Sequence, residues 1–513
     1  MRPLLLLLFV FVAIAPVRGQ SSEVVDAIYR EGTQSSQVVD LAQYLADVIG
    51  PRLTASPGHE RAIDWAISQF DAWNISAGRE AQGTWRSWRR GLVSLDMIEP
   101  RLRSLEGQLL SWSPGTTGSV EGGVLALPDL RGADQFRAWL PNAKGQFILL
   151  SAYEPTCRPA DVWEEYGGAQ ARSEFEARQK ASKDAWQARV ANLGLTTQEI
   201  IDALEEAGVA GFFTNMWTGE RGTDRIFPMA YAFRGAMNHT AAAFNLSCED
   251  YGLLFRLAER GQGPLVRAYG EAEDLGETAA HNVVAVIPGR ELPDEYVLLS
   301  AHFDAWDGSS GMTDNGTGSV TMMEAARILA KHYPNPRRTI VIGLWSGEEQ
   351  GLNGSRAYAA DHPEVVAGLQ ALFNQDNGTG RIARIDMQGL TGALPHFKRW
   401  FNRIPRDLVK GVELVAPGSP GQAGSDYVSF ICAGAPAFNL ASDEFDYRDG
   451  TWHTNRDTFD KISPDDLRDN ATLVALLAYL AAEDERLPRA RDSRDEWPTC
   501  QLPDRSTGDR FRE

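Results

Sequence analysis

The chain has 513 residues, of which 43% are hydrophobic and 23% are charged. This is the composition of a globular protein, and the length suffices for about two or three domains of ordinary size. The formal net charge is -19 and the pI is near 5.0. Such an acidic balance argues against nucleic acid or an anionic membrane as a partner.

Residues 1–19 have the pattern of a secretory signal peptide. Basic Arg2 precedes an apolar stretch that runs from Leu4 to Val17, and the small residue Gly19 follows it. A membrane anchor is the alternative, but the apolar stretch is short for a bilayer and polar residues follow at once. We therefore expect an exported protein, periplasmic or secreted, with no membrane contact after the signal is removed.

The chain contains four cysteines, and none of them lies in the C-x-x-C spacing of a cysteine metal site. In an oxidising compartment they could form two disulfides, and the sequence leaves all three connectivities open. The residues are Cys157, Cys248, Cys432 and Cys500.

Helical patterns dominate the first part of the chain after the signal, residues 20–114. Apolar side chains recur at helical spacing over 36–49 and again over 58–72. The stretch IGPRLTASPG between them is punctuated by Gly and Pro, which predicts a turn.

The pattern changes over residues 115–275. Short apolar stretches, namely GGVLAL, GQFILL and AGFFTN, stand between Gly-rich turns and predict short strands. Residues 161–207 interrupt them with a run rich in Ala, Glu, Gln and Arg, which predicts helix. We interpret this region as a separate β-rich domain that carries a helical insertion.

Residues 276–485 alternate between strand and helix patterns. The strands are continuous apolar runs, as expected for strands that are buried on both faces. This alternation predicts an α/β domain whose sheet contains parallel strands, and we expect the tail, 486–513, to be irregular. The strands are predicted at 281–289, 296–304, 338–347 and 369–376, with a helix over 322–333.

Acidic residues and a histidine follow these strands at their carboxyl ends. Sites in open α/β sheets form outside the carboxyl ends of the strands, so these side chains should meet. Repulsion would destabilise such a cluster of carboxylates unless a divalent metal lay among them. Two histidines and three carboxylates suit a pair of Zn²⁺ ions with one carboxylate bridging. The candidates are His302, Asp304, Glu348, Glu349 and Asp376 at strand ends, with Asp314 and His453 in loops.

Four motifs carry a resemblance to a known family: AHFDAWDGSSGMTDNGTG, LWSGEEQGLNGS, FNQDNGTG and TWHTNRDT. The chain resembles the secreted co-catalytic zinc exopeptidases, the family of carboxypeptidase Q and the bacterial zinc aminopeptidases. The matching pieces span about 35–100 and 280–485. The resemblance therefore implies a catalytic domain with a mixed sheet flanked by helices, built from 20–114 and 276–485. The segment between them is similar to a protease-associated domain.

The resemblance also implies a role for each candidate. Asp314 bridges two zinc ions, His302 and Asp376 complete one site, and Glu349 and His453 complete the other. Glu348 is not a ligand but the general base. From its place in HFD, and not from the resemblance, we expect Asp304 to accept the second ring N–H of His302, the usual arrangement around a ligating histidine, and we count it with Glu348 among the catalytic residues. The peptide bond between Asp314 and Asn315 is expected to be cis.

The expected activity is a metal-dependent hydrolysis of peptide bonds near a free N-terminus, by an aminopeptidase or dipeptidase. The substrate is then a peptide or dipeptide. Two alternatives stay open: a glutaminyl-cyclase-like acyltransferase with one zinc, and a non-catalytic receptor-like protein on the same fold. The oligomeric state is also open, and a homodimer is one option.

Three N-x-S/T sequons lie beside the predicted site, at Asn315, Asn353 and Asn377. A glycan at any of them would block access to the site. We therefore expect these asparagines to be unmodified, which favours a bacterial periplasmic or secreted protein.

Overall fold

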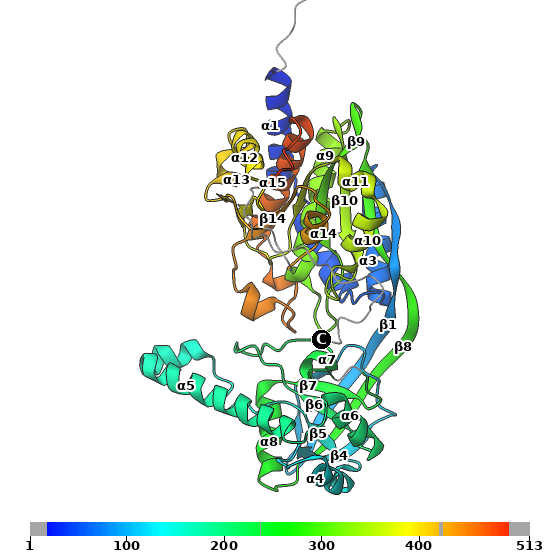
Figure 1. Ribbon diagram of the computed structural model, residues 1–513, viewed down its shortest axis with the longest axis vertical. Coiled ribbons are helices and arrows are strands. Elements are labelled where there is room, and N and C mark those ends of the chain that lie inside the picture. The colour runs from blue at the N-terminus through cyan, green and yellow to red at the C-terminus, as the bar shows by residue number, and fades with distance from the viewer. Residues whose placement is uncertain (1–17, 236–237, 420–423, 492–513) are drawn as a thin grey trace, which may run out of the picture.

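The computed structural model describes residues 18–235, 238–419 and 424–491, which form two lobes joined by a long β-ribbon (Figure 1). The ribbon consists of β1 (Ser76–Glu99) and β8 (Leu265–Ile287), which pair antiparallel along most of their length. Nearly all of the predicted signal peptide lies outside the described residues, so export stays a prediction. Within the described ranges, no helix is both long and apolar enough to cross a membrane.

The upper lobe is built on a mixed sheet with the strand order β13-β12-β14-β11-β9-β10-β8. Three central strands, β9, β10 and β11, are parallel neighbours, and every residue of β10 and β11 is buried. This confirms the predicted α/β fold with a mixed sheet. The strands of the upper lobe beyond the ribbon are β9 (Leu292–His302), β10 (Arg338–Trp345), β11 (Leu369–Asn374), β12 (Ile382–Asp386), β13 (Glu413–Val415) and β14 (Ala437–Ser442).

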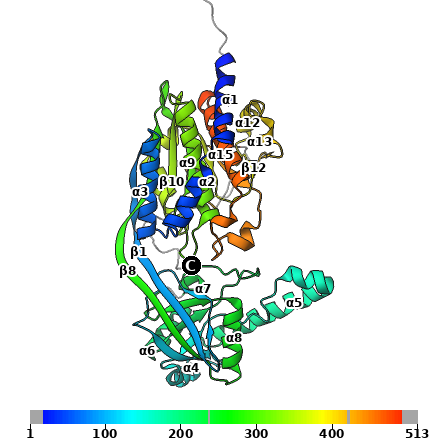
Figure 2. The same ribbon diagram turned by 180° about the vertical axis from the view of Figure 1, so that it is seen from behind.

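Helices cover both faces of this sheet (Figures 1 and 2). Successive residues of β10 point to opposite faces, so Ile340 and Ile342 join one apolar core while Val341 joins another. The first core contains residues of α1 (Arg18–Gln34), α2 (Val38–Gln43), η1 (Tyr44–Ile49), α3 (Pro57–Ala72), α9 (Thr317–His332), α12 (Leu394–Phe401), α13 (Arg406–Val409) and α15 (Pro464–Glu483). The second contains residues of α10 (Asn353–Asp361), α11 (Pro363–Gly368) and α14 (Tyr427–Cys432).

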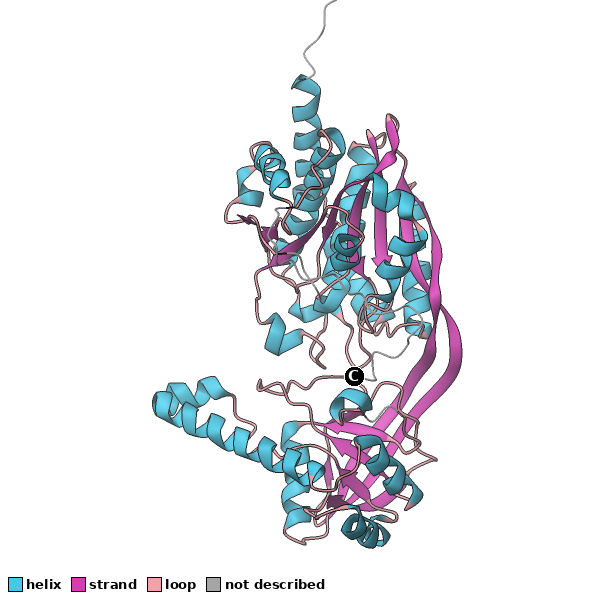
Figure 3. Cartoon of the chain, viewed as in Figure 1, coloured by secondary structure: helices cyan, strands magenta, loops and turns pink. Residues whose placement is uncertain are grey.

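The sheet continues through β8 into the lower lobe, where β4, β5, β6 and β7 are parallel neighbours. Helices flank these short strands, and α5 projects away from the lobe (Figure 3). The lobe is thus a small α/β unit, and its likeness to a protease-associated domain stays a prediction. Its elements are β2 (Arg103–Ser104), β3 (Gly107–Leu109), β4 (Val120–Ala126), α4 (Ala133–Trp139), β5 (Phe147–Leu149), α5 (Ala160–Ala191), α6 (Thr197–Glu206), β6 (Gly211–Thr214), α7 (Met229–Ala232), β7 (Ala243–Leu246) and α8 (Cys248–Glu259).

The sequence suggested domain borders after residues 114 and 275, and the second of these lies within β8. Strand β8 runs without a break from the lower lobe, where it pairs with β4, into the upper lobe, where it pairs with β10. Strand β3, which precedes residue 114, already pairs with β7 of the lower lobe. A change in residue pattern marks turns, whereas a continuous strand can belong to both lobes, so the borders of the domains stay a prediction.

The lower lobe also contains a disulfide between Cys157 and Cys248. It joins the loop before α5 to the first residue of α8. Of the three connectivities that the sequence allowed, only the one with this pair is compatible with the structure, and Cys432 is disulfide-bonded as well.

Candidate metal centre

The predicted site residues meet at the carboxyl ends of the central parallel strands. His302 is the last residue of β9, Glu348 and Glu349 lie in the turn after β10, and Asp376 follows β11. The remaining two come from outside the strands. Asp314 lies in the short helical turn η3 (Met312–Gly316), and His453 lies in the loop after η5 (Tyr447–Thr451). The sheet therefore fixes most of the site, because neighbouring parallel strands end at the same edge.

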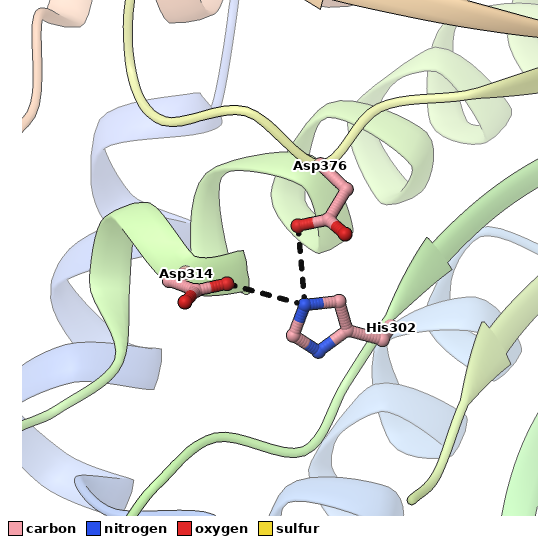
Figure 4. Close-up of side chains that lie close together, drawn as sticks. All are labelled: His302, Asp314 and Asp376. Atoms are coloured by element: carbon pink, nitrogen blue, oxygen red, sulfur yellow. Dashed lines mark hydrogen bonds and ion pairs between the residues drawn. The ribbon is translucent and has the colours of Figure 1, made fainter. Parts of the chain in front are cut away.

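The first group of side chains consists of His302, Asp314 and Asp376, all of which are buried (Figure 4). Nε2 of His302 lies 3.2 Å from Oδ1 of Asp376 and 3.3 Å from Oδ1 of Asp314. The three side chains point toward one common position, with one nitrogen and two oxygens around it.

The second group consists of Asp314, Glu349 and His453. Nε2 of His453 lies 3.1 Å from Oδ2 of Asp314 and 2.7 Å from Oε2 of Glu349. Asp314 thus belongs to both groups and turns one oxygen toward each. The structure brings all five predicted ligands together in the two sets that the resemblance implied.

The chemistry of these donors fits divalent metal ions. Within the described part of the chain, Oδ2 of Asp314 and Oε1 of Glu349 are buried and have no hydrogen-bond partner. Burial raises the pKa of Glu349 to about 7 and also raises the pKa of Asp376. Holding these carboxylates ionised together therefore requires positive charge between them. Imidazole nitrogens with carboxylate oxygens are a ligand set that suits zinc.

Glu348 lies beside the first group but belongs to neither of the two groups. Its Oε2 is 4.0 Å from Nε2 of His302. No hydrogen bond to its carboxylate is found among the described residues, and burial raises the pKa of this carboxyl well above its usual range. The side chain is therefore a carboxyl group at the edge of the centre, without a hydrogen bond to the described residues.

Asp304 holds the turn that carries the two glutamates. Its Oδ1 accepts a hydrogen bond from the backbone N–H of Glu348 (3.1 Å), and its Oδ2 accepts from that of Glu349 (3.3 Å). The predicted partner for His302 needs correction. Nδ1 of His302 lies 3.0 Å from the main-chain oxygen of Asp304 but 3.6 Å from its carboxylate. The carboxylate is engaged by the turn, so the carbonyl is the nearer acceptor for the ring.

Asp457 is a site residue that the sequence analysis missed. Its buried carboxylate accepts hydrogen bonds from the backbone N–H groups of Thr313 (2.6 Å) and Asp314 (3.0 Å). It thereby holds the loop in which the predicted cis peptide bond between Asp314 and Asn315 is confirmed. Asp457 stands in the motif TWHTNRDT, but nothing in that motif shows that its partner lies more than a hundred residues earlier.

Arg52 is a second missed residue, and it fixes the loop that follows β9. Its fully buried guanidinium donates to the main-chain oxygens of Phe303 (2.7 Å), Ser310 (2.6 Å) and Gly311 (2.8 Å). The loop between His302 and Asp314 is thus tied to the N-terminal segment of the chain.

We expect Asp457→Asn to lower the affinity of the centre for zinc by about 10–100-fold, a usual effect of changing a residue that supports a ligand. An amide offers one oxygen where the carboxylate serves two N–H donors, so the loop that carries Asp314 should loosen. Competition with a chromophoric chelator measures this affinity. Asp460→Asn is the matched control, because Asp460 is an exposed acid three residues further on. Wild-type affinity in Asp457→Asn would contradict the assignment.

Burial decides which sequons a glycan could occupy. The side chain of Asn315 is fully buried; it donates to the main-chain oxygen of Gln375 (2.9 Å) and accepts from the N–H of Gly318 (3.1 Å). A glycan has no room at this position in the folded chain. Asn353 and Asn377 are partly exposed, so their expected lack of modification stays a prediction.

Comparison with known proteins agrees with this geometry. The family model of Peptidase family M28 matches residues 282–478, which include every candidate residue. Mouse carboxypeptidase Q is 26% identical over 448 residues, covering 87% of this chain and 86% of the relative. Leucine aminopeptidase 1 of Arthroderma otae is 32% identical over 211 residues, covering 38% of this chain and 56% of the relative.

Solved structures share the fold. The Peptidase M28 precursor from Shewanella amazonensis aligns with a TM-score of 0.63 and 23% identity, covering 92% of this chain and 99% of that one. A zinc aminopeptidase from Bacillus subtilis aligns with a TM-score of 0.55 and 17% identity, covering 87% and 95%. Residues 282–478 are thus similar to peptidase family M28, and with the relatives and the five clustered candidate ligands this match shows that the chain is a metallopeptidase.

Proposed function

We propose that this chain is an exopeptidase that binds two zinc ions and hydrolyses peptide bonds next to a free N-terminus. One observation carries the proposal. Asp314 faces His302 and Asp376 with one oxygen and His453 with the other, so two complete ligand groups share a single carboxylate. A centre built for one ion would need only one of these groups.

Each ligand then has a place. His302 and Asp376 would hold one ion, Glu349 and His453 would hold the other, and Asp314 would contribute an oxygen to each. When bound, zinc supplies Lewis acidity, which polarises a carbonyl group and lowers the pKa of water toward neutrality.

Glu348 is the general base in this proposal. Its carboxylate accepts the proton of the water that attacks the scissile carbonyl and returns the proton to the leaving amine. Two features support this role: its oxygen lies 4.0 Å from a ligand histidine, and its carboxylate is free of hydrogen bonds to the described residues. Asp304 positions it by holding the N–H of the turn.

The names of the relatives point to opposite ends of a peptide. The mouse protein is called a carboxypeptidase, whereas the fungal relative and the Bacillus protein are called aminopeptidases. A dipeptide is a possible substrate for a carboxypeptidase and for an aminopeptidase, because its single peptide bond is next to both termini. We therefore propose dipeptides and short peptides with a free α-amine as the substrate class.

The test combines metal content with a substrate panel. The purified chain should contain two equivalents of zinc, cleave free dipeptides and aminoacyl amides, and leave N-acetylated analogues intact. A single equivalent of zinc with cyclisation of N-terminal glutamine would instead support the acyltransferase alternative. Absence of all hydrolysis in the zinc-loaded protein would support the receptor-like one. Equal cleavage of acetylated and free substrates would overturn the requirement for a free N-terminus.

A further inference from the structure

A segment of the lower lobe lies directly against the loop that carries His453. Residues 222–227 run antiparallel to residues 453–456, with a β-bridge between Arg225 and Thr454. The N–H of Ile226 donates to the main-chain oxygen of His453 at 2.9 Å. The N–H of Asn455 donates to the main-chain oxygen of Asp224 at 3.0 Å. A candidate metal ligand of the upper lobe is therefore bonded through its backbone to the lower lobe.

Arg225 adds side-chain contacts to this backbone pairing. Its guanidinium lies 4.8 Å from the ring centroid of Trp452, the residue before His453. The same guanidinium donates to the main-chain oxygens of Trp452 and of Arg448, the latter at 2.9 Å. One side chain of the lower lobe thus fixes two points of the loop just ahead of His453.

Aromatic rings hold the imidazole of His453. Trp452 stacks on it with centroids 4.0 Å apart, and Phe227 of the lower lobe meets it edge-on at 5.0 Å. The ring of Trp306, from the loop after β9, also packs against it, with the two centroids 6.1 Å apart. The ring is therefore oriented by packing, and Phe227 supplies part of that packing from the other lobe.

Nε2 of His453 faces the carboxylates of Asp314 and Glu349, but the other ring nitrogen is not held by a hydrogen bond to the described residues. Its Nδ1 is buried and has no hydrogen-bond partner in the described part of the chain, whereas Nδ1 of His302 has the carbonyl of Asp304. Ligating histidines usually depend on such a partner for their orientation. The backbone of His453 has φ +53°, in the left-handed region that non-glycine residues occupy only where their surroundings enforce it.

We propose that Arg225, Ile226 and Phe227 are positioning residues for His453, so that the lower lobe sets the metal affinity of the second group alone. The hydrogen bonds and ion pairs described for His302, Asp376 and the shared Asp314 are all with the upper lobe. The metal affinity of the first group should therefore not depend on the lower lobe. This inference rests on the proposed two-ion function.

The test is a calorimetric titration of the metal-free protein with zinc, comparing the wild type with Arg225→Gln and Phe227→Leu. Both variants should weaken one of the two binding events by about 10–100-fold and leave the other unchanged. Arg225→Lys should recover part of the loss, since a lysine keeps the cation over Trp452. The absorption spectrum of the cobalt-loaded protein should also change in these variants, because the ligand field around the second ion changes.

Arg90→Gln is the matched control. Arg90 is also a cation that bridges the lobes, through Asp307 at 2.6 Å, but it makes no described contact with His453. Both binding events should be unchanged in this variant. If Arg225→Gln and Phe227→Leu both bound the two zinc ions with wild-type affinity, the inference would be overturned and the two-ion function would stand. Uptake of a single ion by the wild-type protein would overturn both. Equal weakening of both events would show that the lower lobe supports the whole centre and would overturn the claim of selectivity.

Discussion

Replacing Glu348 with Gln should lower turnover by about 10²–10⁴-fold, the usual contribution of a general base, while both zinc ions stay bound. The amide has nearly the shape of the carboxylate but cannot accept a proton. Glu348 belongs to neither ligand group, and its backbone N–H stays bonded to Asp304, so the turn should keep its conformation. Steady-state kinetics on a dipeptide and zinc analysis of the same preparation measure the two effects.

Glu349→Gln is the matched control, since it is the same substitution one residue further along the turn. This change replaces a charged ligand with a neutral amide and should weaken the second metal group, whose His453 lies 2.7 Å from the Glu349 carboxylate. Activity should then recover in part with excess zinc, whereas that of Glu348→Gln should not. Loss of zinc in Glu348→Gln with retention in Glu349→Gln would exchange the two roles. Full turnover in both variants would place the catalytic centre elsewhere.

Removing the metal should abolish peptidase activity, and adding zinc to the metal-free protein should restore it. The physical reason is the crowding of three candidate ligand carboxylates, of which Asp314 and Glu349 have buried oxygens without hydrogen-bond partners among the described residues. Dialysis against a strong chelator, followed by assay before and after addition of zinc, measures the effect. The thermal unfolding temperature should fall on chelation and rise again with zinc, because ions that bind only the folded state stabilise it.

Magnesium serves as the control for this experiment. It prefers octahedral oxygen coordination and should not replace zinc among imidazole nitrogens. Hydrolysis at the original rate by a preparation shown to be free of metal would refute the metal-dependent mechanism. Restoration by magnesium as complete as that by zinc would refute the choice of metal.

The identity of the site residues could be predicted from short stretches of sequence. His302, Glu348, Glu349 and Asp376 each stand at or just after the end of an apolar run typical of a buried strand, and parallel strands end at a common edge. That argument places residues far apart in the sequence next to each other without any knowledge of side-chain packing. Asp314 and His453 were predicted from the motifs in which they stand, and the structure places both beside the strand ends.

Contacts between distant segments could be decided only by the tertiary structure. No local pattern shows that Asp457 bonds to the loop of Asp314, or that the carboxylate of Asp304 serves the glutamate turn rather than the ring of His302. The continuous ribbon of β1 and β8 likewise could not be predicted from the positions of turn residues.

The dependence of His453 on the lower lobe has the same origin. Hydrophobic periodicity and turn residues are local signals, so they specify which elements form and which residues end them. The pairing of residues 222–227 with residues 453–456 is set by how two lobes pack against each other. The sequence by this reasoning determines the candidate ligands of the centre, whereas only the packing of the lobes determines how His453 is held.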